Sequence, residues 1–302
     1  MNNFYNEWLI MKKKLLLNTL LVFLLTVSSA LAEETSESKK FPGVSVSVSS
    51  AYLGDAEVDG SSGSFSTVNS GVEVKACHFS VIYENEAYSW NNRSDLDFVK
   101  DGKTPWDTLQ KLGVGYDNYY AFDEQNILIY GAQVSSQFED EITGDSVSVA
   151  GLVGYNYWFT ENFNVTIGVA AAYNPIDWMV LPAVGLQYTH DKWVVNLGFP
   201  FTNVGYQFSD KFAVRADVGL EQSVYRLSND SDVAQEGYVR KREAKLSLLA
   251  DWNCLENMKI SFGPQFVFAR QMKFYTSAHN RTGSTEDIDG TWGLAANITM
   301  HF

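Results

Sequence analysis

The sequence predicts an all-β fold, a transmembrane, antiparallel, up-and-down β-barrel of about twelve strands. Side chains alternate between apolar and polar in one segment after another, which is typical of strands with two unlike faces. Most of these segments are about 11–17 residues long. A strand of a globular protein has about 5–6 residues, whereas a tilted membrane-spanning strand needs about 9–11. Aromatic residues, 14% of the chain, gather toward the segment ends, as they do at membrane interfaces.

The N-terminus predicts an exported protein. A basic stretch begins at Met11, an apolar run follows from Leu15 to Val27, and small residues end at Ala32. This order is typical of a secretory signal peptide over residues 1–32, cleaved after Ala32. We expect residues 1–10 to be a mis-assigned upstream extension, and residues 33–42 to be a polar leader before a barrel over 43–302.

The last strand shows the alternation most clearly. Every second residue from Trp292 to Phe302 is apolar, and the residues between them are mainly small or polar. Similar alternation predicts strands within 211–221, 243–252 and 259–268. The remaining candidate strands are 43–53, 71–85, 108–122, 126–138, 146–159, 163–173, 178–189 and 192–208.

Two of these segments change parity partway along. The apolar positions switch from even to odd near Cys77, and from odd to even near Pro200. A change of parity requires a bulge or a turn, and proline cannot donate a hydrogen bond within a central sheet. If a segment turns there it becomes two strands, so ten or fourteen strands remain open beside twelve. Tight turns are also expected at 160–162 and 190–192, and short turns belong at one end of a barrel.

These features resemble the single-chain outer-membrane β-barrels of Gram-negative bacteria, including uncharacterised porin-like families. The resemblance covers about residues 43–302 in architecture, and its one sharp motif is the alternating last strand that ends in Phe302. In such barrels a terminal aromatic residue is the signal read by the barrel-assembly machinery. The resemblance therefore implies this role for Phe302, with outer-membrane lipid and lipopolysaccharide as the surroundings of the barrel.

Charged residues on the polar faces of three consecutive strands are the main candidate site. We expect them to face the lumen and to select solutes by charge and size. A structural lattice of ion pairs filling a narrow lumen is the alternative interpretation. The candidate lumen-lining residues are Lys211, Arg215, Asp217, Glu221, Lys241, Glu243, Lys245 and Lys259, with Asp251 and Gln265 beside them.

Other chemistry is sparse in the sequence. The net charge of −14 argues against nucleic-acid binding, because a row of phosphates would remain unneutralised. We expect neither a cofactor nor a metal, since no His or Cys residues have the spacing of metal ligands except the adjacent Cys77 and His78, which a strand would point apart. Whether Cys77 pairs with Cys254 stays open.

The function that this sequence predicts is passive diffusion of small hydrophilic solutes through a charge-lined lumen, without enzymatic activity. Two alternatives are a closed structural or adhesive barrel that acts through acidic outer loops, and an outer-membrane hydrolase that uses His190 or His279. A soluble secreted β-sandwich is the alternative at the level of the fold.

Overall fold

The computed structural model describes residues 43–302, so the predicted signal peptide and polar leader lie outside the described residues. No helix in this range is long and apolar enough to span a membrane. Three short 3-10 helices, η1 (Arg93–Asp95), η2 (Lys100–Gly102) and η3 (Gly144–Ser146), lie in loops. The strands are β1 (Val44–Glu57), β2 (Ser64–Ala76), β3 (Phe79–Asn91), β4 (Thr108–Ala121), β5 (Asn126–Phe138), β6 (Val147–Thr160), β7 (Phe163–Tyr173), β8 (Trp178–His190), β9 (Trp193–Gly198), β10 (Phe201–Ser209), β11 (Phe212–Arg226), β12 (Tyr238–Leu255), β13 (Met258–Tyr275), β14 (Arg281–Ile288) and β15 (Thr291–His301).

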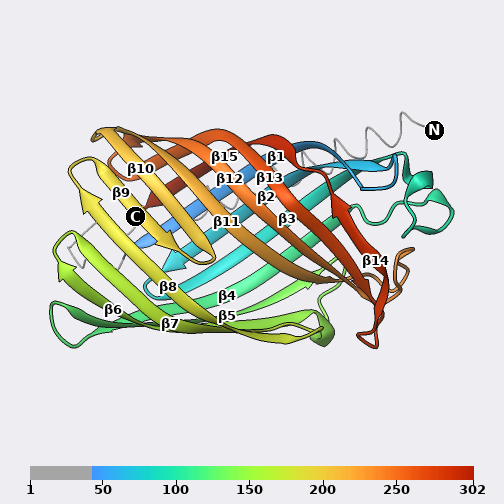
Figure 1. Cartoon of the computed structure of the whole chain (residues 1–302), viewed down its shortest axis with the longest axis horizontal. Coiled ribbons are helices and arrows are strands. Elements are labelled where there is room, and N and C mark those ends of the chain that lie inside the picture. Colours follow the sequence, from blue (N-terminus) through green and yellow to red (C-terminus); the bar gives the residue numbers. More distant parts are fainter. Residues whose placement is uncertain (1–42) are drawn as a thin grey trace, which may run out of the picture. The chain divides into compact units, whose positions relative to one another are not determined.

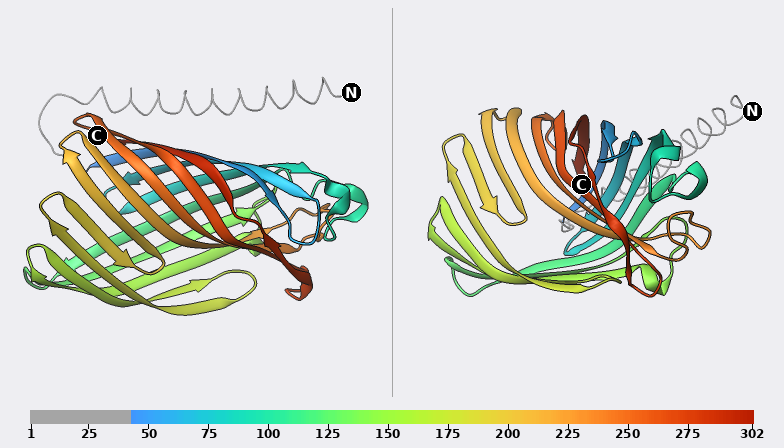
Figure 2. Two further views of the ribbon diagram at one scale, coloured as in Figure 1. Left: turned by 45° about the horizontal axis from the view of Figure 1, so that its top comes forward. Right: turned by 45° about the vertical axis from the view of Figure 1, so that its right-hand side comes forward.

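Fourteen of the fifteen strands form one closed antiparallel ring. Consecutive strands pair from β1 to β13, β13 also pairs with β15, and β15 pairs with β1. The remaining strand, β14, pairs with the far end of β13, forms one bridge from Ile288 to Val58 and lies outside the ring. Figures 1 and 2 show the resulting barrel with its tilted strands. The predicted all-β antiparallel barrel is therefore confirmed, and the alternative of a β-sandwich does not apply.

The predicted number of about twelve strands is wrong, and the two parity changes explain the difference. Cys77 and His78 form a tight turn between β2 and β3, and Phe199 and Pro200 form the turn between β9 and β10. Each of two predicted strands is thus a hairpin of two strands, which raises the count from twelve to fourteen. The second split also puts the turns at 160–162 and 190–192 at the same end as the short turn at Asp210 and Lys211.

The two ends of the barrel differ. Connections of two to four residues join the strands at one end, which we call the turn end. The longer connections, including residues 92–107 and 227–237, lie at the other, which we call the loop end. Residues 273–289, which join β13 to β15, are only partly irregular, because β13 continues to Tyr275 and β14 occupies most of the rest.

The outer face of the barrel is apolar. Side chains that alternate outward along neighbouring strands remain exposed to the surroundings although they are large and hydrophobic, as Val153, Ile167, Val184 and Leu294 illustrate. Aromatic residues continue this surface at the turn end, among them Tyr120, Phe122, Trp193, Phe208 and Trp252. An apolar belt with an aromatic rim is the outer surface that a lipid bilayer requires.

The interior at the loop end is filled on one side by an apolar core. Inward-facing residues of β2, β3, β12 and β13 meet loop residues such as Leu96, Trp106 and Leu227. The Trp106 ring packs edge-on against Tyr88 and Trp90, with ring centroids 5.6 Å and 5.3 Å apart, and its carbonyl accepts a hydrogen bond from the Trp90 indole. The loops are therefore anchored inside the barrel rather than left in solvent.

Candidate channel interior

Strands β11, β12 and β13 place alternate polar side chains inside the ring. Odd-numbered residues of β11 and β12 share one face because the register is uninterrupted from Phe212↔Trp252 to Arg226↔Tyr238. On β13 the inward positions are odd up to Val267, and a bulge then shifts the pairing. Ala269 adopts a left-handed conformation in this bulge (φ 50°), so Arg270 faces inward instead.

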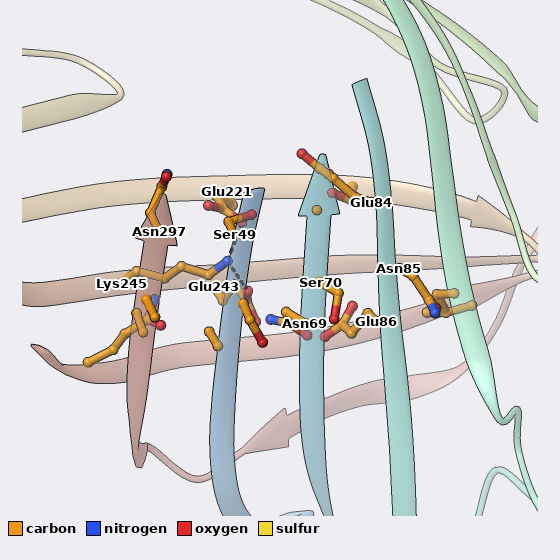
Figure 3. Close-up of a pocket in the computed structure, with 18 of the residues that line it drawn as sticks. Ser49, Asn69, Ser70, Glu84, Asn85, Glu86, Glu221, Glu243, Lys245 and Asn297 are labelled. Carbon is orange, nitrogen blue, oxygen red and sulfur yellow. Dashed lines mark hydrogen bonds and ion pairs between the residues drawn. The ribbon is translucent and has the colours of Figure 1, made fainter. Parts of the chain in front are cut away.

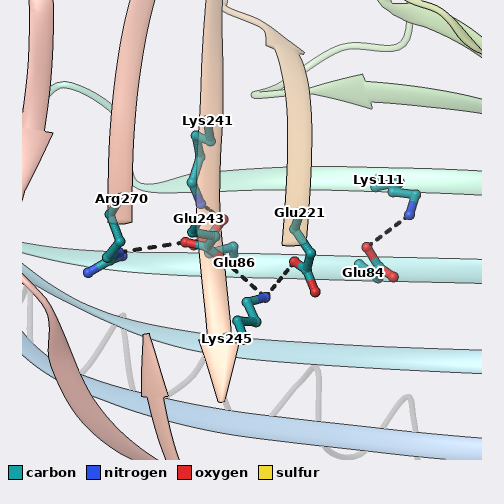
Figure 4. A network of polar contacts seen from close by, with 8 residues as sticks. All are labelled: Glu84, Glu86, Lys111, Glu221, Lys241, Glu243, Lys245 and Arg270. Atoms are coloured by element: carbon teal, nitrogen blue, oxygen red, sulfur yellow. Dashed lines mark hydrogen bonds and ion pairs between the residues drawn. The ribbon is translucent and has the colours of Figure 1, made fainter. Parts of the chain in front are cut away.

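The inward charges form two separate ion-paired groups. Nearer the turn end, Arg215 contacts Asp217 at 3.0 Å and Asp251 at 3.0 Å. Closer to the loop end, the ammonium of Lys245 lies 2.5 Å from a Glu221 oxygen and 3.0 Å from a Glu243 oxygen. Figure 4 shows Lys245 between these two carboxylates.

Two further cations neutralise carboxylates beside this group. Arg270 lies 3.6 Å from Glu243 and over the ring of Phe65, 4.9 Å from its centroid. Lys241 of β12 pairs with Glu86 of β3, five strands away around the ring, so this ion pair crosses the interior. Both of its side chains are almost fully buried, with 8% and 11% exposed. This ion pair therefore links β12 to β3 through the interior of the barrel.

A cavity of about 340 Å³ lies among these groups. Ser49, Asn69, Glu84 and Asn297 line it together with the charged residues of β11 and β12, as Figure 3 shows for the labelled residues. Hydroxyl, amide, carboxylate and ammonium groups thus surround one space. Such a lining can hydrogen-bond water and small polar solutes, and it offers both signs of charge.

Five of the eight predicted lumen-lining residues come together around this cavity. They are Arg215, Glu221, Lys241, Glu243 and Lys245. Asp217 pairs with Arg215 next to the cavity, and Lys259 is half-buried on β13 opposite Asn253. Lys211 is exposed in the turn between β10 and β11, because the strand begins one residue later than its alternation indicates.

The anionic partners on β3 were missed by the sequence analysis. Glu84 lies on the inner face, 3.3 Å from Lys111 of β4, and Glu86 pairs with Lys241. Ser80, Ile82, Glu84, Glu86 and Tyr88 alternate on one face of β3. This alternation was the available signal, but it starts only after the parity change at Cys77.

The opposite part of the inner wall has a different character. In their part toward the loop end, strands β6, β7 and β8 turn small or apolar residues inward, and these line an open groove of about 400 Å³. Toward the turn end the inward residues of the same strands are polar and hydrogen-bonded to one another, as Asn156, Asn164 and Gln187 show. The groove also reaches Glu73, Ser80, Asp117 and Gln133 on β2 to β5. Its members on β6 to β8 are Ala150, Gly151, Leu152, Ala170, Ala171, Ala172, Met179 and Leu181.

The remaining sequence candidates lie apart from both spaces. His190 is at the turn end, 3.4 Å from the exposed Asp191, whereas His279 is in the turn between β13 and β14 beside Tyr238. The two histidines are thus at opposite ends of the barrel. Cys77 and Cys254 are unpaired, and Phe302 is exposed directly after β15. Among residues 43–302, no group of three or more His, Cys, Asp or Glu residues is arranged to hold a metal.

Comparison with known proteins gives a family without a described function. A family model described as "Domain of unknown function (DUF6268)" matches residues 112–297. No curated protein sequence matches the chain.

Several solved structures share the barrel fold at low sequence identity. An outer-membrane channel from Pseudomonas putida F1 is 9% identical, with a TM-score of 0.42 over 89% of this chain and 98% of that one. A FadL homologue from Pseudomonas aeruginosa is 9% identical, with a TM-score of 0.41 over 87% and 90%. The KdgM porin is 9% identical, with a TM-score of 0.35 over 85% and 99%.

The barrel itself establishes the location of the chain. A closed ring leaves no strand edge along its circumference at the turn end, and its outer face is an apolar belt with aromatic residues at the rim. In lipid, backbone groups must be satisfied internally, which only helices and closed barrels achieve. The chain is therefore a bacterial outer-membrane β-barrel, as the sequence predicted.

Proposed function

We propose, from the premise that this chain belongs to the family described as "Domain of unknown function (DUF6268)", that it is a channel for passive diffusion of small hydrophilic solutes. The observation that carries the proposal is the cavity inside the ring, lined by paired charges and by hydroxyl and amide groups. Barrels of eight strands are filled by side chains, whereas those of 16–18 strands hold open channels. A ring of fourteen strands is closer in size to the barrels that hold open channels.

The mechanism that fits this lining is diffusion filtered by size and by charge. Lys245 is held between two carboxylates and Lys241 is paired with Glu86, so their ammonium groups stay in place while a solute passes. Glu221 is the most accessible charge of the group, with 55% of its side chain exposed, and is therefore the group best placed to meet a passing ion. No cofactor takes part in this mechanism.

Conductance in a planar bilayer tests the proposal. We expect the refolded chain to give stable channels, and Glu221→Gln to lower the cation-to-anion permeability ratio. Two unit charges 4 Å apart in water interact by about 1 kcal/mol, which corresponds to at most about a five-fold change in local ion concentration. Glu256→Gln, an equal change in the turn between β12 and β13, serves as the control and should leave the ratio unchanged.

A closed barrel is the second candidate, and the apolar core at the loop end favours it. Trp106, Leu227 and Val239 are almost fully buried inside the ring, so side chains fill part of the interior. In that case the loops, which carry acidic runs such as Glu139 to Glu141, would hold the function. A folded barrel that migrates differently after heating but shows no conductance would reject the channel and favour this candidate.

A further inference from the structure

The wall of the barrel is interrupted between β8 and β11. These two strands are joined by the β9–β10 hairpin, which is short and ends partway along both of them, as Figure 1 shows. The last backbone hydrogen bonds on either side run from Phe199 to the Val184 carbonyl and from Leu220 to the Pro200 carbonyl. Beyond them, residues 178–183 of β8 pair with β7 but with no other described strand.

The sequence of β8 agrees with a free edge at this place. Because backbone groups alternate sides along a strand, the Val184 carbonyl and the nitrogen of residue 182 face the same side. Residue 182 is a proline, which has no N–H to donate. Within sheets, proline is found at edges, where no N–H is needed, and at strand starts and bulges. The edge still carries the N–H and carbonyl of Val180 and the carbonyl of Pro182.

Strand β11 does not turn back to cover this edge. Above Leu220 it approaches β5 instead, where Val224 donates its N–H to the Gln137 side chain at 3.1 Å and Arg226 forms a bridge with Phe138. The N–H of Glu139 then donates to the Arg226 carbonyl at 2.9 Å. The far part of β11 is thus bonded to β5 and not to β8.

The turn between β7 and β8 closes the interruption at the loop end. Asp177 in this turn pairs with Arg240 of β12 at 2.6 Å, and Ile176 packs against Val224, Tyr238 and Tyr275. The interruption therefore has four borders: residues 178–183, residues 220–226, this turn and the tip of the β9–β10 hairpin. We call it the β8–β11 window.

The apolar groove of the inner wall leads to this window. Its end on β8 is formed by Met179 and Leu181, which belong to residues 178–183, the segment that pairs with β7 alone. The neighbouring residues Val180 and Val184 face outward and are about half exposed in the lipid-facing belt. The groove thus ends at the unpaired edge of β8, and its volume of about 400 Å³ lies within the usual 300–1,000 Å³ of small-molecule sites.

We propose that the β8–β11 window admits an amphipathic molecule, mainly hydrocarbon with one hydrogen-bonding group, between the bilayer and the groove. The small and apolar side chains of β6 to β8 receive the hydrocarbon part, since transferring it from water to such a surface gains about 25 cal/mol per Å². The free backbone groups of Val180 and Pro182 bind the polar group, which removes the cost of an unpaired edge at membrane depth. This route is separate from the charged cavity and does not depend on conductance.

Photolabelling in vesicles tests this proposal. The probe is decanol carrying an aliphatic diazirine, dissolved in phospholipid vesicles that contain the refolded chain, and the labelled residues are mapped by mass spectrometry. We expect labelling of Met179, Leu181 and Ala172, which face inward, in addition to the outward Val180. Ile129, an inward apolar residue of β5 where both neighbouring strands are paired, should remain unlabelled.

Two substitutions on β7 provide a matched pair. Ala172→Trp fills the groove and should reduce labelling of Met179 and Leu181 at least several-fold while Val180 keeps its label. Val169→Trp adds a ring to the lipid-facing side of the same strand, where Val169 is 53% exposed and outside the groove, and should change neither. Ala150→Trp on β6 replaces the first variant if that one does not fold. Labelling confined to outward residues, or inward labelling that Ala172→Trp and Ala150→Trp leave unchanged, would overturn the proposal.

Discussion

The inner wall of this barrel has two parts of opposite character. Strands β11 to β13, with β3 facing them, carry ion-paired side chains inward, whereas β6 to β8 carry alanine, glycine and aliphatic side chains inward in their part toward the loop end. Both parts have the same apolar outer face. This difference shows that the lipid requires apolar side chains only on the outer face of each strand. The inner face can therefore be charged in one part of the ring and apolar in another.

The largest effect that we expect comes from breaking the charged part. Glu243→Gln leaves Lys245 with one carboxylate and deprives Arg270 of its ion-pair partner, so it should lower the free energy of unfolding by about 3–5 kcal/mol. Glu73→Gln removes a partner of the more exposed Lys75 and should cost about 0–1 kcal/mol. Denaturant titration in vesicles measures both. Equal losses would show that the buried network does not stabilise the barrel.

A lysine scan on β6 tests which side faces lipid where both faces are apolar. Val153 points outward and is 56% exposed, whereas its neighbour Leu152 lines the groove. Val153→Lys should cost about 2–4 kcal/mol, the usual price of a cation at the bilayer midplane. Leu152→Lys should cost less, because its ammonium can reach the interior. The reverse order of unfolding free energies would mean that the two faces are assigned the wrong way round.

Close packing of the apolar part depends on glycine at one position. A Cβ on Gly168 of β7 would lie 2.3 Å from the Val153 carbonyl oxygen and 2.7 Å from the Gly154 Cα. We therefore expect Gly168→Ala to destabilise the barrel by about 1–3 kcal/mol. Gly151→Ala is the control, since its nearest contact would be 3.6 Å, an ordinary distance. A neutral Gly168→Ala would show that β6 and β7 can separate easily.

The smallest effect concerns the junction of the two parts at the loop end. Glu139 accepts a hydrogen bond from the Ser228 N–H at 2.8 Å, and burial raises the pKa of its carboxyl from 4.5 to about 7. Between these values the folded chain binds a proton that the unfolded chain has released. Stability should therefore fall as the pH rises from about 4.5 to about 7. Glu139→Gln should reduce this fall in stability, measured as the shift in denaturant midpoint between pH 5 and pH 8. If the variant shows the same shift, groups other than Glu139 cause the pH dependence.

The same contrast explains what could be predicted from the sequence. Alternation is strong where one face is charged, so β11 to β13 and their inward residues Arg215, Glu243 and Lys245 were identified from spacing alone. Toward the loop end of β7 and β8 both faces are small or apolar, and spacing could not separate Ala171 from Ala172. The parity changes at Cys77 and Pro200 were visible in the sequence, but only the pairing shows that each is a turn.

Contacts between distant parts of the chain left no local signal. Glu86 and Lys241 are 155 residues apart in sequence, and their pairing depends on how the ring closes. The same holds for Trp106, whose loop has no periodicity although the residue is almost completely buried. The bulge at Ala269 has a similar origin, because one residue in a left-handed conformation decides that Arg270 faces the interior.

The pairing of β1 with β15 has a consequence for how the chain can be cut. Ser45 lies opposite His301 and Leu53 opposite Gly293, so the first and last strands are bonded like any other neighbours. The ring therefore has no intrinsic first strand. Joining these two ends with a short linker and opening the Cys77–His78 turn would give a circular permutant with the same neighbours throughout. Such a molecule would retain every strand pair while moving Phe302 away from the terminus. It would therefore show whether the terminal position of Phe302 is needed for folding or only for insertion into the membrane.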